Sequence, residues 1–104
     1  MRIKTGRFNF GKDKGSGPRT QDQIVDFGAG VKLTNAVAVV TGANFGFSPN
    51  DDHNFGLTEI TVRGVIVGPT SQSVQVTATF GVRDWSGDWD DYYEGWIEYA
   101  VLAD

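Results

Sequence analysis

The chain has no cysteine and a single histidine among its 104 residues. Without cysteine it can have no disulfide framework, no thiolate metal site and no cysteine nucleophile. Its nine basic residues are scattered along a chain of net charge -4, so no basic stripe indicates a nucleic-acid partner. No apolar run approaches the roughly 20 residues of a membrane span. The opening MRIKTGRFNF has charge but no apolar segment, so a secretory signal peptide is not expected there.

The chain also lacks the apolar stripe, with a period of about 3.6 residues, that marks an amphipathic helix. Fourteen glycines and three prolines instead place turn signals at short intervals. Two stretches, 59–68 and 73–82, alternate apolar and polar residues as half-buried strands do. The apolar side chains that share a face are Ile60, Val62 and Ile66 in the first stretch, and Val74, Val76, Ala78, Phe80 and Val82 in the second.

Four other segments predict strands: RIKTGRFNF (2–10), QIVDF (23–27), AVAVVTG (36–42) and GWIEYAVLAD (95–104). The apolar run at 36–42 suits a central strand, and the short connection 68–73 predicts a hairpin. Strands of this number in 104 residues, with 39% hydrophobic and 21% charged residues, indicate one soluble domain over 1–104. The predicted fold is all-β, a single antiparallel β-sandwich of about six strands.

The segment RDWSGDWDDYYEG, 83–95, gathers two of the three tryptophans and two of the three tyrosines. Of the neighbours Tyr92 and Tyr93, only one can face inward on a strand, and Trp96 just beyond is expected in the core. Loops at the end of a rigid sandwich often bind ligands. A sugar presents an apolar C–H face and a rim of hydroxyls, which suit rings beside charged groups. We therefore predict a carbohydrate site centred on Arg83, Asp84, Trp85 and Trp89, with Tyr92 beside them.

Two further possibilities concern metal and the lone histidine. Asp84, Asp88, Asp90 and Asp91 offer the oxygen ligands that calcium prefers. Their spacing does not match the EF-hand loop, and Asp and Gly also favour tight turns, so a solvated turn without a cofactor is the better expectation. His53 lies beside Asp52 in a second loop. A solvated loop histidine is expected there, and both residues become secondary sugar contacts if that loop lies at the same end.

Catalysis and assembly are the competing uses of the 83–95 segment. Asp88 and Glu94 form a nominal carboxylate pair for glycoside hydrolysis. No serine stands in a nucleophile-elbow context, and a chain this short leaves little depth for a cleft, so we expect no enzyme activity. Aromatic residues and arginine are also enriched at interface hot spots. A structural or receptor-binding assembly module, whose aromatic loop forms a subunit contact, is therefore the alternative to a sugar site.

Four segments resemble parts of the H-type lectin family, in order the first strand, an aromatic-ended strand with the loop and apolar strand after it, the central hairpin and the final strand. They are IKTGRFNFG, IVDFGAGVKLTNAVAVVTG, EITVRGVIVGPTSQSVQVTATFGV and YEGWIEYAVLAD. The resemblance implies a six-stranded sandwich that binds galactose or N-acetylgalactosamine between protomers of a homo-trimer or hexamer. It also implies binding roles for Gly17 and Arg19 in GPRT, for Arg63 on a later strand, and for Trp85 with Tyr92 or Tyr93. Thr20 stands where the family has an acidic residue, and no histidine follows Trp85.

Overall fold

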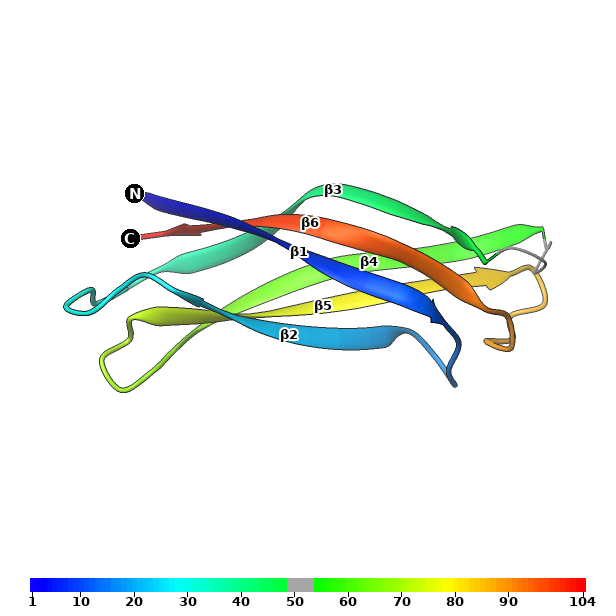
Figure 1. Ribbon diagram of the computed structural model, residues 1–104, viewed down its shortest axis with the longest axis horizontal. Helices are drawn as coiled ribbons and strands as arrows, with labels where there is room; N and C mark the ends of the chain where they lie inside the picture. The colour runs from blue at the N-terminus through cyan, green and yellow to red at the C-terminus, as the bar shows by residue number, and fades with distance from the viewer. Residues whose placement is uncertain (49–53) are drawn as a thin grey trace.

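The structure, a computed structural model, describes residues 1–48 and 54–104. These residues form the strands β1 (Arg2–Asp13), β2 (Arg19–Asp26), β3 (Ala36–Phe47), β4 (Phe55–Val67), β5 (Ser73–Asp84) and β6 (Tyr93–Ala103). All pairings are antiparallel, and they make two three-stranded sheets with the orders β1-β6-β3 and β2-β5-β4. The sheets pack face to face (Figure 1). The predicted antiparallel β-sandwich is confirmed.

The core lies between β5 and β6, the central strands of their sheets. The alternation predicted for β5 is confirmed, because the apolar side chains that it places on one face are all buried. They meet Phe8 and Phe10 of β1 and Ile97 and Tyr99 of β6. Ile60, Val62 and Ile66 of β4 pack against the margin of this core, also as predicted.

The hairpin predicted over 68–73 is confirmed. Val67 pairs with Ser73, and the intervening turn holds Gly68 at φ 102° and Ser71 at φ 59°. Glycine adopts a positive φ at no steric cost, which explains why the chain reverses at Gly68. The Gln72 side chain accepts from the Thr70 main chain and hydroxyl (3.2 and 2.9 Å) and completes the turn.

Two predictions about the sheet β1-β6-β3 are wrong. The apolar run at 36–42 forms an edge strand, β3, because β6 has apolar residues on both faces and takes the central place. Trp96 lies on the outer face and is only half-buried, because Ile97 occupies the inward position beside it. The prediction for the tyrosine pair is confirmed: Tyr93 is buried, and Tyr92 faces solvent.

The two long sides of the sandwich differ in chemistry. On the β1–β2 side, polar side chains bond the backbone of the opposite sheet. Gln21 Nε2 donates to the Asn9 carbonyl (2.8 Å), Gln23 Nε2 to the Arg7 carbonyl (2.7 Å), and Lys4 Nζ to the Asp26 carbonyl (2.6 Å). On the β3–β4 side, two exposed rings meet instead: Phe45 of β3 and Phe55 of β4, with their centroids 6.2 Å apart.

The connections β1–β2 and β5–β6 lie at one end of the sandwich, which we call the loop end (Figure 1). The connections β2–β3 and β4–β5 lie at the other end, together with both chain termini. Within the described residues, no helix is long and apolar enough to cross a membrane.

Candidate functional site

The β5–β6 connection opens with a hydrogen-bonded turn built on Asp84. One oxygen of its carboxylate, Oδ1, accepts from both the main-chain N–H (2.9 Å) and the hydroxyl of Ser86. The Gly87 N–H donates to the Asp84 carbonyl (3.4 Å), and Gly87 has the positive φ, 84°, that this turn requires. The Asp88 N–H in turn donates to Ser86 Oγ (3.2 Å). The carboxylate predicted to bind sugar therefore also holds the loop in shape.

The turn presents its two tryptophans differently. Trp85, the first residue after β5, is 77% exposed. Trp89 folds back instead: it packs against the core cluster, above Gly81, with its ring centroid 6.3 Å from that of Tyr93. Of the two rings predicted to contact a ligand, the structure leaves Trp85 open and uses Trp89 to anchor the loop.

Tyr92 faces solvent beside two lysines that the sequence did not reveal as neighbours. Its side chain is 38% exposed, and the ammonium groups of Lys12 and Lys14 lie 5.3 and 5.0 Å from its ring centroid. Lys12 lies near the end of β1 and Lys14 just after it, far from Tyr92 in the chain, and only the β1–β6 pairing brings them close. The Tyr92 carbonyl accepts from the Ser48 N–H (2.9 Å), which ties this position to the end of β3.

Arg83 and Arg19, both predicted to bind sugar, are half-buried at the loop end. Arg83 Nη1 donates to the Asp84 carbonyl (3.2 Å). Arg19 is more firmly engaged, since Nη1 donates to the Gly11 carbonyl and Nη2 to the Tyr93 carbonyl, both at 2.9 Å. Its guanidinium also lies over the Tyr93 ring, at 4.4 Å from the centroid. These contacts give Arg19 a structural role between β1, β2 and β6.

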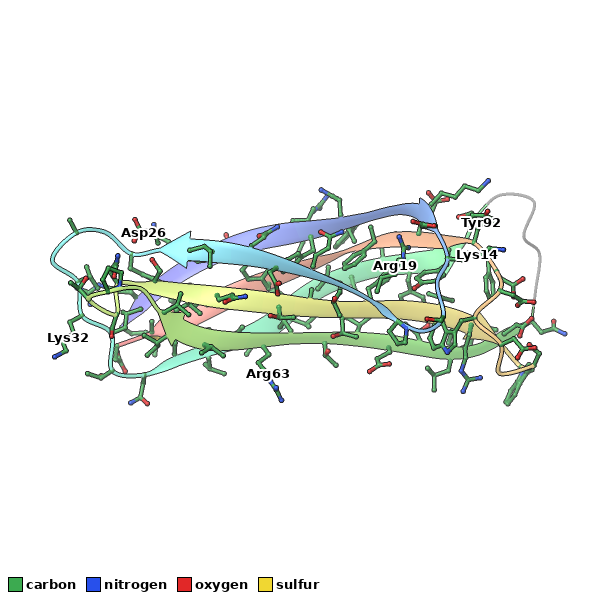
Figure 2. The ribbon with its side chains drawn as sticks, turned by 90° about the horizontal axis from the view of Figure 1, so that it is seen from below. Lys14, Arg19, Asp26, Lys32, Arg63 and Tyr92 are labelled. Carbon is green, nitrogen blue, oxygen red and sulfur yellow. The ribbon has the colours of Figure 1, made fainter. Side chains whose placement is uncertain are left out.

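The remaining predicted residues are spread more widely. Gly17 lies at the loop end, in the β1–β2 connection. Figure 2 shows Lys14, Arg19 and Tyr92 together at that end, whereas Arg63 projects from the middle of β4, away from them. Arg63 pairs with Thr77 and lines a shallow hollow on the outer face of its own sheet. Asp52 and His53 lie outside the described residues.

The carboxylates of the loop do not converge. Among residues 1–48 and 54–104, no three acidic or histidine side chains form a group that could hold a metal ion. Asp88 and Asp90 are exposed, while Asp91 is buried. Glu94 lies on the outer face of the sheet β1-β6-β3, because its neighbours Tyr93 and Gly95 face inward. The geometry thus adds no support for calcium or for an Asp88–Glu94 catalytic pair.

The loop end combines an exposed indole, a half-exposed phenol ring, two lysines and an arginine. The indole stands on a turn that internal hydrogen bonds hold in shape. Comparison of the chain with protein-family models, with curated proteins and with solved structures finds no match. Of the expected likeness to H-type lectins, the six-stranded antiparallel sandwich of two three-stranded sheets is therefore what stands.

Proposed function

We propose that the chain is a carbohydrate-binding lectin module that recognises galactose- or N-acetylgalactosamine-type glycans and acts multivalently as an oligomer. The observation that carries this proposal is the exposed indole of Trp85 on a hydrogen-bonded turn. A large ring held in water by an ordered turn loses little conformational entropy when a ligand covers it, because the loop is already in place.

Three side chains form the proposed contact surface. Trp85 packs against the C–H face of the sugar. Arg83 supplies N–H donors to hydroxyl groups, since only one of its five donors is needed for the Asp84 carbonyl. Tyr92 offers a ring and a hydroxyl beside the two lysine ammonium groups. Trp89 and Arg19 support this surface through their contacts with the core and the main chain.

Multivalency follows from the weakness expected of one such site. A single shallow sugar site has a Kd of roughly millimolar, about 4 kcal/mol of binding free energy. Several sites on one assembly raise the avidity without any new contact. The exposed rings of Phe45 on β3 and Phe55 on β4 supply a surface through which copies can associate, and a homo-trimer or hexamer is the arrangement we propose.

Substitution of the exposed ring tests the proposal. We expect Trp85→Ala to lose binding on a glycan array and in titrations with N-acetylgalactosamine, because it removes the apolar contact and leaves the fold unchanged. Ile24→Ala is the matched control, since Ile24 is another exposed apolar side chain, on β2. The array is run with and without chelator. Absence of binding to every sugar in the wild-type chain would overturn the proposal.

A specific observation favours the alternative, an assembly module whose aromatic loop forms a subunit contact. The rings of Phe45 and Phe55 lie 6.2 Å apart, half-exposed, and Leu57 pairs with Arg83 at the base of the loop. Trp85 therefore directly follows the strand pairs that carry Phe55 and Leu57. If Trp85→Ala dissociates the oligomer in sedimentation velocity, while no glycan binds the wild-type chain, the alternative is the correct function.

A further inference from the structure

A second surface with the chemistry of a ligand site lies on the outer face of the sheet β1-β6-β3. It is a hollow of about 540 Å³ that all three strands border. Its first row consists of Asn9, Trp96 and Asn44, which lie side by side because Trp96 pairs with both asparagines. Two carboxamides thus flank one half-buried indole ring on an open sheet face.

The hollow exists because two neighbouring positions have no side chain. In the next outward row Glu94 pairs with Gly46, and Gly11 lies where β1 shifts register between Phe10 and Asp13. A Cβ atom added at Gly11 or Gly46 would meet no atom within 4 Å. The space beside Trp96 is therefore open, and one carboxylate stands in it between two glycines.

The residues that line the hollow carry charge of one sign. Glu94 is the charged side chain that lines it, and no basic residue does so among those the structure describes. The cations close by are engaged elsewhere. The Arg7 guanidinium lies over the Trp96 ring, 4.3 Å from the centroid, and pairs with Glu98 at 3.4 Å, and the Lys12 ammonium, next to Gly11, lies over the Tyr92 ring. Because the charged group that lines the hollow is a carboxylate, the hollow favours a neutral ligand with many hydroxyl groups over an anionic one.

We propose that this hollow binds the neutral pyranose ring of a glycan. Each carboxamide both donates and accepts hydrogen bonds, the Glu94 carboxylate accepts them, and the indole contacts C–H groups, which together match a ring rimmed with hydroxyls. The volume falls within the range of about 300–1,000 Å³ usual for small-ligand sites. The hollow shares no residue with the surface of Arg83, Trp85 and Tyr92. It is a separate site, whether or not that surface binds sugar.

The test is a titration of the ¹⁵N-labelled chain with the methyl glycosides of galactose, glucose and mannose, followed by NMR. We expect at least one glycoside to shift the Trp96 indole N–H and the side-chain amides of Asn9 and Asn44, with a Kd of roughly millimolar. Gly46→Val should raise the Kd obtained from these shifts about tenfold or more, because its side chain fills the hollow at a position where the backbone tolerates one. Thr5→Val, on β1 and not among the residues that line the hollow, is the control.

Two further variants sharpen the outcome. Asn44→Ala, on the exposed edge strand, should weaken glycoside binding in the same way. It replaces Gly46→Val as the test if that variant does not fold. Glu94→Gln should still bind the neutral glycosides and should also bind methyl galacturonide, because it removes the negative charge that disfavours this anion. Shifts of the Trp85 indole N–H report the loop surface separately, and shifts of Trp96 that persist in Trp85→Ala belong to the hollow. If no glycoside shifts Trp96, or if its shifts persist in both Gly46→Val and Asn44→Ala, the hollow is not a sugar site.

Discussion

Trp89 rests on a position that leaves room for its ring. An ideal Cβ atom at Gly81 would lie 2.7 Å from the indole of Trp89 and 3.2 Å from the Pro18 Cα atom. Gly81 is itself buried in the central strand β5. The orientation of the β5–β6 connection, and with it the position of Trp85, therefore depends on the absence of a side chain at Gly81.

We predict that Gly81→Ala destabilises the chain by about 1–3 kcal/mol, because the new methyl group displaces a packed indole. Urea denaturation measures the loss, and tryptophan fluorescence should move to the red as Trp89 becomes exposed. Gly46→Ala is the matched control, since its methyl group meets open space, and should change the stability by no more than about 0.5 kcal/mol. Equal stability of the two variants would contradict this role for Gly81.

Tyr99 is a buried titratable side chain. Its hydroxyl donates to Gln23 Oε1 (2.6 Å), and burial raises the pKa of Tyr99 above its ordinary value, because the phenolate would lose its hydration. The unfolded chain, with a pKa of about 10, then loses its proton at a lower pH than the folded chain. The stability from this group is complete below about pH 10 and falls as pH rises through the folded pKa.

We predict that Tyr99→Phe reduces the loss of stability above about pH 10, because it removes the group that titrates. At neutral pH the same variant should cost about 1 kcal/mol through the lost hydrogen bond to Gln23. Urea denaturation at a series of alkaline pH values checks both effects. A variant with the same alkaline slope as the wild-type chain would show that Tyr99 does not contribute to it.

At the level of the strands, the side chains of β2 seal the edge of β1. Gln21 and Gln23 reach backbone carbonyls of β1, and Arg19 adds a third such contact at the loop end. Unpaired carbonyls on an edge strand are a template for unwanted strand addition, and polar side chains that occupy them suppress it. The same contacts hold the two sheets in register along their β1–β2 side.

We predict that Arg19→Met costs about 2–3 kcal/mol of stability. It keeps the apolar stem beside Phe10 and Tyr93 but removes both hydrogen bonds to main-chain carbonyls. Arg63→Met is the control, because Arg63 is exposed on the outer face of its sheet, and should stay within about 0.5 kcal/mol. If both variants unfold at the same urea concentration as the wild-type chain, Arg19 is free to serve a ligand.

The sequence predicted the strands better than their order. The alternation in β5 was decisive, because a period of two leaves one face for the core. Local pattern could not show that β3 lies at an edge, since an apolar run suits any strand with a partly buried face. It could not show that Trp96 faces outward, because β6 has apolar residues on both faces, and the local pattern does not reveal which face meets the core. The approach of Lys12 and Lys14 to Tyr92 likewise arises only from pairing between distant segments.

At the scale of the whole molecule, the two long sides differ: polar side chains bridge the sheets along β1 and β2, and two exposed rings meet along β3 and β4. The exposed rings of Phe45 and Phe55, at 46% and 51% exposure, contact each other on the β3–β4 side. Exposed apolar side chains that gather in one region mark a surface for association. This difference indicates which strands form the contact in the proposed oligomer: copies would meet through β3 and β4, and β1 and β2 would face outward.

We predict that the double variant Phe45→Ser with Phe55→Ser lowers the sedimentation coefficient to that of a single chain. It removes apolar surface that the core does not use, so its urea midpoint should stay close to that of the wild-type chain. Ile24→Ser, which removes an exposed apolar side chain from β2, should leave the association unchanged. A wild-type chain that sediments as a monomer at every concentration would contradict the oligomer.

The sandwich measures 50 × 21 × 18 Å, and both chain ends lie at the opposite end from the exposed Trp85. A chain tethered by either terminus, to a sensor surface or to a fused partner, would therefore hold Trp85 at the end that points away from the tether. Three such rods gathered side by side would point their tips in one direction, toward a glycan-bearing surface instead of toward one another.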